Sequence, residues 1–246
     1  MKPRVGFFDF ASCEGCQLTV LNLENELLDL VELMEIVEFR EISSAHGEEL
    51  DIAFVEGSIC RPEDVKRLRA IRARSRQLIA LGACADTAGI NALTSDRPVA
   101  ELVREVYGDK GEAFLVAGRP RPLEAFVPVD GRVPGCPIDG GEFLTVLQAL
   151  LIGRTPELPT FAVCAECKLR ELPCTFERDV ICLGPITRAG CNAHCIAEGD
   201  RCRGCRGMVD APRSGPYYRI LEEYGLSEEQ IRDELRLYNL GGEAKK

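Results

Sequence analysis

The sequence predicts an α/β fold in three parts. Over roughly the first two-thirds of the 246 residues, stretches with strand patterns alternate with stretches of helical periodicity, which is typical of a parallel sheet covered on both faces. A Pro- and Gly-containing stretch without either period follows, and helical periodicity returns near the C-terminus. We therefore expect a flavodoxin-like doubly wound domain over residues 1–153, an irregular domain over 154–212 and a helical C-terminal tail over 213–246.

Each element of the first domain is predicted from its periodicity. The expected strands are 4–10, 34–40, 51–56, 77–83 and 125–129. The expected helices are 18–33, 65–76, 98–107 and 141–152, with Pro62 at a position where a helix can begin. In the tail, Ser227 and Gln230 have the spacing of a capping box ahead of the apolar positions Ile231, Leu235 and Leu237.

The irregular domain lacks the apolar pattern of an ordinary core, so something else must organise it. The chain has 13 cysteines, and eight of them lie between Cys164 and Cys205. With no secretory signal at the start and no apolar stretch long enough to span a membrane, we expect a cytoplasmic protein without membrane insertion. In a reducing compartment, cysteines at this density indicate metal ligands rather than disulfides.

A first group of cysteines follows the expected strands. Cys13 and Cys16 come after the first strand, Cys84 after the fourth and Cys136 after the last. Since ligands bind at the carboxyl edge of such sheets, four thiolates from three Gly-bearing loops suit a cubane [4Fe–4S] cluster. The alternative is a set of buried free thiols, which is how we interpret the isolated Cys60.

The other eight cysteines form two quartets. The quartets are Cys164-x2-Cys167-x6-Cys174-x7-Cys182 and Cys191-x3-Cys195-x6-Cys202-x2-Cys205. Each quartet can supply four sulfurs to one cluster, although the CxxC pairs also suit a four-thiolate zinc site. His194 is expected to lie beside a cluster without ligating it.

Charge excludes one class of partner. The net charge of −10 and the scarcity of aromatic side chains argue against nucleic acid as a ligand. The basic helix 65–76 is interpreted as a solvated face paired with nearby acids.

The motifs together resemble a known family. CEGC near the N-terminus, GACADTAGI, PGCPIDGGEF, CLGPITRAGC and CRGCRG are similar, in this order, to the small, electron-transferring subunit of cytoplasmic [NiFe] hydrogenases. The N-terminal domain also resembles the 20-kDa subunit of respiratory complex I. Ala88 and Ile138 depart from the general family pattern and fit the branch that couples hydrogen to NAD(P), coenzyme F420 or heterodisulfide reductase.

The resemblance implies a role for each quartet. Cys13, Cys16, Cys84 and Cys136 match the ligands of a proximal cluster, which lies nearest the Ni–Fe centre of a partner large subunit. Cys164, Cys167, Cys174 and Cys182 match a distal cluster, and Cys191, Cys195, Cys202 and Cys205 a medial one. All three clusters are then [4Fe–4S].

The expected function is electron transfer through three clusters, between the large subunit's hydrogen-oxidising or proton-reducing site and a diaphorase, flavin or other Fe–S electron-transfer subunit. No catalytic acid or base is expected in this chain. Two alternatives stay open: a related relay whose large subunit lacks nickel, and a zinc-stabilised scaffold.

Overall fold

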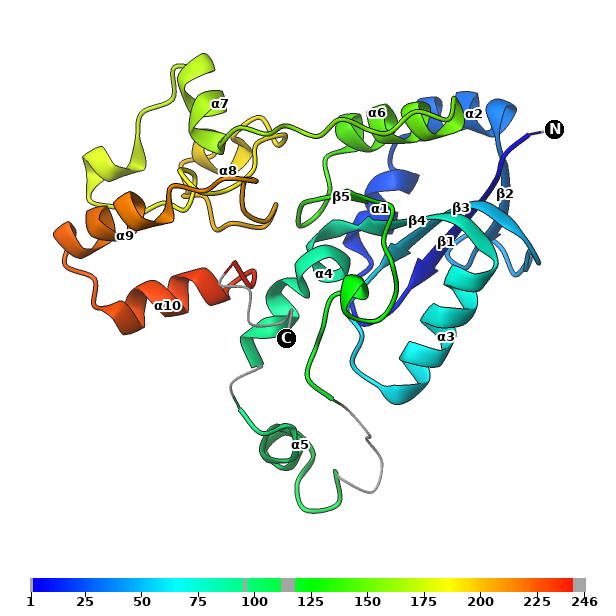
Figure 1. Cartoon of the computed structure of the whole chain (residues 1–246), viewed down its shortest axis with the longest axis horizontal. Helices are drawn as coiled ribbons and strands as arrows, with labels where there is room; N and C mark the ends of the chain where they lie inside the picture. Colours follow the sequence, from blue (N-terminus) through cyan, green and yellow to red (C-terminus); the bar gives the residue numbers. More distant parts are fainter. Residues whose placement is uncertain (1, 95–96, 112–117, 241–246) are drawn as a thin grey trace.

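A five-stranded parallel sheet forms the centre of the N-terminal domain (Figure 1). The structure, a computed structural model, describes residues 2–94, 97–111 and 118–240, so the last residues of the expected tail lie outside it. The strand order is β2-β1-β3-β4-β5. The strands are β1 (Arg4–Asp9), β2 (Glu35–Phe39), β3 (Leu50–Glu56), β4 (Ser75–Leu81) and β5 (Gly131–Val133). This order confirms the predicted flavodoxin-like topology.

Helices cover both faces of the sheet because its strands are apolar on both sides. Phe7, which stacks on Phe39 with ring centroids 4.5 Å apart, belongs to the core beneath one set of helices. These helices are α1 (Gly15–Leu21), α2 (Glu24–Leu33) and α6 (Gly140–Leu151). Its neighbour Phe8 points to the opposite face, where α3 (Pro62–Ala73) packs through Leu68 and Ile71. Successive side chains of β1 therefore belong to two separate hydrophobic cores, one on each face of the sheet.

Three predicted elements differ from the structure. The stretch 125–129 is not a strand. Its first residue ends a 3₁₀ turn, Leu123–Ala125, and Leu123 and Val127 fill the core on the α3 side of the sheet. Pro128 lacks a ladder N–H, and pairing starts only at Gly131. The expected helix 18–33 is broken between α1 and α2, where Leu23 turns toward Gly140 of α6.

The third difference is at the end of α3. The helix stops at Ala73 rather than residue 76, because Ser75 and Arg76 already belong to β4. Arginines at this end pair with acids, Arg72 with Asp130 at 2.6 Å and Arg74 with Glu38 at 2.7 Å. The basic stretch therefore is a solvated face with local acidic partners, as predicted.

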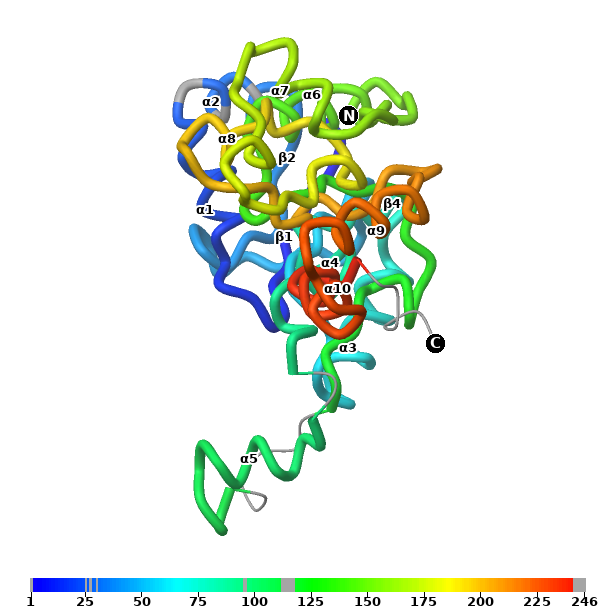
Figure 2. The backbone as a smooth tube through the Cα atoms, turned by 90° about the vertical axis from the view of Figure 1, so that its left-hand side faces the viewer, coloured from blue at the N-terminus to red at the C-terminus, as the bar shows by residue number. Residues whose placement is uncertain are grey.

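The remaining helices lie partly beside the sheet, as α4 does, and partly in the region that carries the last eight cysteines and in the tail. They are α4 (Gly82–Thr87), the 3₁₀ helix η1 (Gly89–Thr94), α5 (Val99–Tyr107), α7 (Val163–Leu169), η4 (Thr175–Arg178), α8 (His194–Ala197), α9 (Ser214–Glu223) and α10 (Glu228–Arg236). Residues 154–213, all of which the structure describes, contain no strand longer than an isolated bridge. Helix α5 projects away from the rest of the chain (Figure 2). In the described ranges, no helix is long and apolar enough to cross a membrane.

The tail is attached to the irregular region by an apolar core of its own. Tyr217 and Leu221 of α9 and Ile231 and Leu235 of α10 are buried together with Leu183. Ser227 and Gln230 form the predicted capping box at the start of α10. The tail thereby lies directly against the region that carries the last eight cysteines.

Candidate metal centres

The first quartet lies at the carboxyl edge of the sheet. Cys13 follows β1, Cys16 lies in the first turn of α1, Cys84 lies in α4 directly after β4, and Cys136 follows β5. Their thiols are close enough to interact electrostatically, Cys16 with Cys84 and Cys136, and Cys84 with Cys13. The structure thus brings together four cysteines from three segments that are widely separated in sequence.

Glycines leave room for these sulfur atoms. Gly82 has a positive φ of 81°, and a Cβ atom there would overlap Cys16 Sγ. Gly89 is similar, since a Cβ atom would lie 3.1 Å from Cys84 Sγ. Side chains at these positions would therefore displace the thiols.

A buried carboxylate supports this edge. Glu56, at the end of β3, is 1% exposed and accepts hydrogen bonds from the N–H groups of Cys16 (3.2 Å) and Gln17 (3.1 Å). Burial raises the pKa of Glu56, which the two N–H groups partly oppose. Glu56 therefore fixes the start of α1, and with it Cys16. Its position at a strand end was the only sequence signal for it.

The last quartet in sequence surrounds a cavity of about 170 Å³. Cys191, Cys195, Cys202 and Cys205 all line this cavity, which we call the medial cavity. Cys202 is 6% exposed, and its thiol interacts with the Gly204 N–H and the Thr187 side chain. Polar hydrogens directed at sulfur are typical of iron–sulfur ligation, where they tune the cluster potential.

Cys164, Cys167, Cys174 and Cys182 line a second cavity, of about 110 Å³, which we call the distal cavity. The N–H groups of Gly184 and Cys202 donate to Cys182 Sγ at 3.4 and 3.3 Å. Cys174 is exposed, so this cavity lies close to the surface.

The three quartets adjoin one another in a fixed order. Cys136 of the first quartet also lines the medial cavity, and its backbone N–H is a hydrogen-bond partner of the Cys205 thiol. On the other side, the Cys202–Cys182 contact joins the medial to the distal cavity, and Ile196 lines both. The medial quartet therefore lies between the other two.

Without a bound metal, thiols in these positions keep their protons. Burial raises the pKa of Cys84, Cys164 and Cys205 to about 12, and that of Cys16 and Cys202 further. Among the described residues, no three Cys, His, Asp or Glu side chains converge on a position for a single metal ion. In a cubane each thiolate binds a different iron, so the four sulfurs surround a volume. Cysteine-lined cavities with N–H groups directed at sulfur fit such a group.

Two charged side chains within the cysteine motifs brace the segment 189–207, which carries Cys191, Cys195, Cys202 and Cys205 and which we call the medial loop. Glu166, between Cys164 and Cys167, accepts hydrogen bonds from the N–H groups of Gly190 (2.7 Å) and Ala193 (3.0 Å). Arg206 is 2% exposed; it donates to the carbonyls of Ala189 and Pro134 and pairs with Glu142 of α6 at 2.6 Å. Arg206 thus links the medial loop to the sheet domain.

The tail contributes Tyr238, which no sequence pattern had indicated. Tyr238 lines the medial cavity, and its hydroxyl is a hydrogen-bond partner of the Cys136 thiol. Burial raises the pKa of Tyr238 above its ordinary value, so the hydroxyl keeps its proton.

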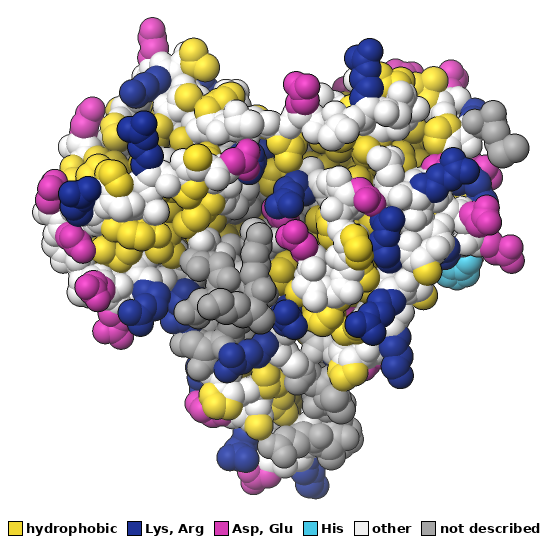
Figure 3. Space-filling model, viewed as in Figure 1, with side chains coloured by type: hydrophobic (Ala, Val, Ile, Leu, Met, Phe, Trp, Pro, Cys, Tyr) yellow, Lys and Arg dark blue, Asp and Glu magenta, His cyan; other side chains and the backbone are white. Residues whose placement is uncertain are grey.

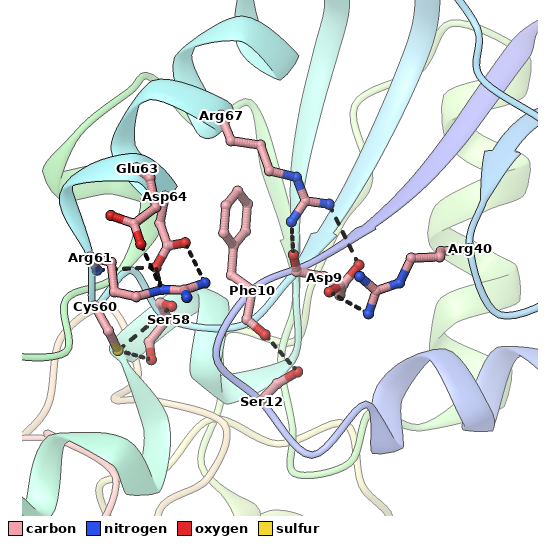
Figure 4. A network of polar contacts seen from close by, with 10 residues as sticks. All are labelled: Asp9, Phe10, Ser12, Arg40, Ser58, Cys60, Arg61, Glu63, Asp64 and Arg67. Carbon is pink, nitrogen blue, oxygen red and sulfur yellow. Dashed lines mark hydrogen bonds and ion pairs between the residues drawn. The ribbon is translucent and has the colours of Figure 1, made fainter. Parts of the chain in front are cut away.

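Cys60 lies apart from the cysteine-lined cavities. Figure 4 shows it beside Ser58, whose hydroxyl is 3.6 Å from Cys60 Sγ, at the start of α3. In the same view Arg40 and Arg67 converge on Asp9, at 3.1 and 3.5 Å. Glu14, which has a left-handed backbone, lies 3.7 Å from Arg40, and these ion pairs hold the loop before Cys16.

His194 begins the short helix α8. The residue is exposed, and its backbone N–H, not its ring, interacts with the Cys191 thiol. Its backbone is therefore part of the medial loop.

Comparisons with known proteins find relatives over most of the chain. The family model described as NADH ubiquinone oxidoreductase, 20 Kd subunit, matches residues 13–150. The delta subunit of sulfhydrogenase 2 from Pyrococcus furiosus is 38% identical over 96% of this chain and 98% of its own length. A subunit of the vhu F420-non-reducing hydrogenase from Methanocaldococcus jannaschii is 32% identical over 85% of this chain and 83% of its own length.

Solved structures show the same relationship. A chain of an NAD⁺-reducing [NiFe]-hydrogenase in the H2-reduced state superposes with a TM-score of 0.57 and 31% identity, covering 65% of this chain and 96% of that one. A chain of the [NiFeSe] hydrogenase from Desulfovibrio vulgaris Hildenborough shares the fold, with a TM-score of 0.57 and 18% identity over 87% of this chain and 96% of that one.

These findings first place the chain in the class of redox subunits that have the 20 Kd subunit domain. Within that class, the chain belongs to the family of [NiFe] hydrogenase small subunits. It is an electron-transfer subunit of an oxidoreductase, and the catalytic centre of such an enzyme lies in the partner large subunit.

Proposed function

We propose that this chain carries three [4Fe–4S] clusters in a row, within a cytoplasmic hydrogenase complex. Cys13, Cys16, Cys84 and Cys136 would hold the proximal cluster, Cys191, Cys195, Cys202 and Cys205 the medial one, and Cys164, Cys167, Cys174 and Cys182 the distal one. When bound, such clusters supply one-electron transfer between the nickel–iron site of the large subunit and a second redox subunit. The single observation that carries this proposal is the position of the medial quartet, in contact with Cys136 on one side and Cys182 on the other.

The two ends of this row are accessible to partners. Cys13 is exposed at one end. Leu18, in helix α1 that directly follows the Cys13 loop, is 50% exposed. At the other end Cys174 is exposed, and Leu169 of α7 is 82% exposed. Apolar side chains beside an exposed ligand position are typical of a docking surface. We assign the first end to the large subunit and the second to a diaphorase, flavin or other Fe–S subunit.

The surface charge is compatible with protein partners. In Figure 3 acidic and basic side chains are interspersed over the visible face, with apolar patches between them. The chain carries 40 acidic and 30 basic side chains, so the proposal includes no nucleic acid.

The domain division follows the same interpretation. We assign residues 1–153 to the sheet domain with the proximal cluster, 154–212 to the region with the medial and distal clusters, and 213–246 to the tail. The hydrophobic core of residues 154–212 supports this division. It is small, and cysteines make up much of the buried cluster around Val163 and Ile196. Bound clusters would replace the missing hydrocarbon core.

The test is the Cys136→Ser variant in the complex purified anaerobically with its native partners. We expect hydrogen-dependent dye reduction to be lost while the distal cluster keeps its electron paramagnetic resonance (EPR) signal. Cys60→Ser is the matched control and should leave both unchanged. Unchanged turnover in Cys136→Ser would refute the assignment of Cys136 to the proximal cluster.

A further inference from the structure

Tyr238 occupies the junction between the first and the medial quartets. It lies two residues beyond α10 and lines the medial cavity together with Cys136 and the four medial cysteines. Its hydroxyl is a hydrogen-bond partner of the Cys136 thiol, and it also interacts electrostatically with Cys205 and Cys195. The side chain therefore faces sulfur atoms from both quartets.

The residues around Tyr238 hold it in this position. The Asn239 side chain donates to the Thr87 carbonyl of α4 at 2.8 Å, in the helix that carries Cys84. Leu240 is 6% exposed and packs on Gly204, where an added Cβ atom would overlap it. Upstream, Arg201 binds Glu234 of α10 through two hydrogen bonds of 2.7 and 3.0 Å. The tail is thus attached both to the sheet domain and to the medial loop.

A hydroxyl directed at a cluster ligand has a defined electrostatic effect. Reduction adds negative charge to a cluster and its sulfurs, and a hydrogen-bond donor stabilises that charge, so it raises the reduction potential. Tyrosine also has an apolar ring, which fills space that water would otherwise enter. Phenylalanine keeps the ring and removes only the donor.

We propose that Tyr238 is a positioning residue of the relay, whose hydroxyl hydrogen-bonds Cys136 and raises the reduction potential of the proximal cluster. The inference rests on the proposed function, because it requires that Cys136 hold a cluster. It goes beyond it by giving the C-terminal tail a role in setting the energy of one electron-transfer step.

The experiment uses the whole complex, purified anaerobically, with Tyr238→Phe compared with the unsubstituted chain. The control is Tyr224→Phe. Tyr224 is another tyrosine of the tail; its hydroxyl donates to the Phe176 carbonyl at 3.1 Å, and the residue lines neither the medial nor the distal cavity. Midpoint potentials are measured by EPR-monitored redox titration, and the proximal signal is the one that Cys136→Ser alters. Electron–nuclear double resonance in H2O and D2O then detects exchangeable protons coupled to that signal.

We expect Tyr238→Phe to shift the proximal midpoint to a more negative value and to lose one exchangeable-proton coupling, with iron content unchanged. Tyr224→Phe should change neither quantity. An unchanged potential and coupling in Tyr238→Phe would overturn the inference while leaving the three-cluster proposal intact, as would a Phe variant that assembles without iron. Absence of iron–sulfur signals from the unsubstituted complex would overturn the proposed function and the inference with it.

Discussion

Substitution of Arg206 tests most directly how the medial loop is attached to the sheet domain. The Arg206 side chain is 1% exposed, and its ion pair with the Glu142 side chain, which is 10% exposed, joins the medial loop to helix α6 at 2.6 Å. Two further hydrogen bonds, to the Ala189 and Pro134 carbonyls at 2.8 and 2.9 Å, satisfy the same group. Replacing Arg206 by Met removes all of these and leaves Glu142 buried without its cation.

The expected cost follows from burial. Removing one partner of a buried ion pair costs about 3–5 kcal/mol. For a domain of this size, each kcal/mol lowers Tm by about 2–4 °C, so a loss of about 4 kcal/mol lowers Tm by ~8–16 °C. Burial raises the pKa of Glu142, and Arg206 opposes this effect. Once Arg206 is removed, the carboxyl would take up a proton, which restores part of the lost stability.

The assay is thermal unfolding of the anaerobic complex, followed by loss of visible cluster absorbance and by circular dichroism. Arg203→Met is the matched control: Arg203 pairs with Asp200 on the same loop, but both side chains are nearly half exposed, and such pairs contribute about 1 kcal/mol or less. The double variant Arg206→Met/Glu142→Leu should recover part of the loss, with a coupling energy of about 2 kcal/mol. If Arg206→Met melts at the same temperature as Arg203→Met, the reasoning is wrong.

Further predictions concern iron retention and the tail. Gly82→Ala should lower iron content, measured by elemental analysis, because the new Cβ overlaps Cys16 Sγ and the backbone has a positive φ; full iron content would contradict this. Glu166→Gln should weaken the medial EPR signal more than the proximal one, since it loses a charged acceptor for the medial loop's N–H groups. Ser227→Ala should destabilise α10 by about 1 kcal/mol, seen as faster amide exchange in that helix, and unaltered exchange would argue against the capping box.

Much of the fold followed from the sequence because apolar periodicity reports burial directly. The strands that became β1 to β4 and the helices α3, α5 and α6 were predicted within a few residues. The fifth strand was misplaced. The apolar residues Leu123 and Val127 pack into the core from a turn and a loop, and they do not pair with a neighbouring strand. Apolar character alone does not separate these two situations.

The candidate sites were predictable for a different reason. Cysteine spacing in a motif is local, and a doubly wound sheet places every loop after a strand at one edge, so the first quartet could be grouped before its geometry was known. Glu56, Arg206 and Tyr238 could not be identified in this way. Their roles depend on contacts with residues distant in sequence, such as Arg206 with Glu142 and Tyr238 with Cys136. No local pattern marks such partners.

The measurement that tests the central claim most directly is the metal content of the complex, purified anaerobically with its native partners, per copy of this chain. We predict one nickel and about 13 iron, from three cubanes and one iron of the nickel–iron centre, if this chain supplies the only clusters. Partner subunits that carry clusters of their own add a known amount, which is subtracted after those subunits are analysed separately. Zinc with little iron would contradict the relay altogether, and about 12 iron without nickel would keep the three clusters while contradicting the assignment to a hydrogenase.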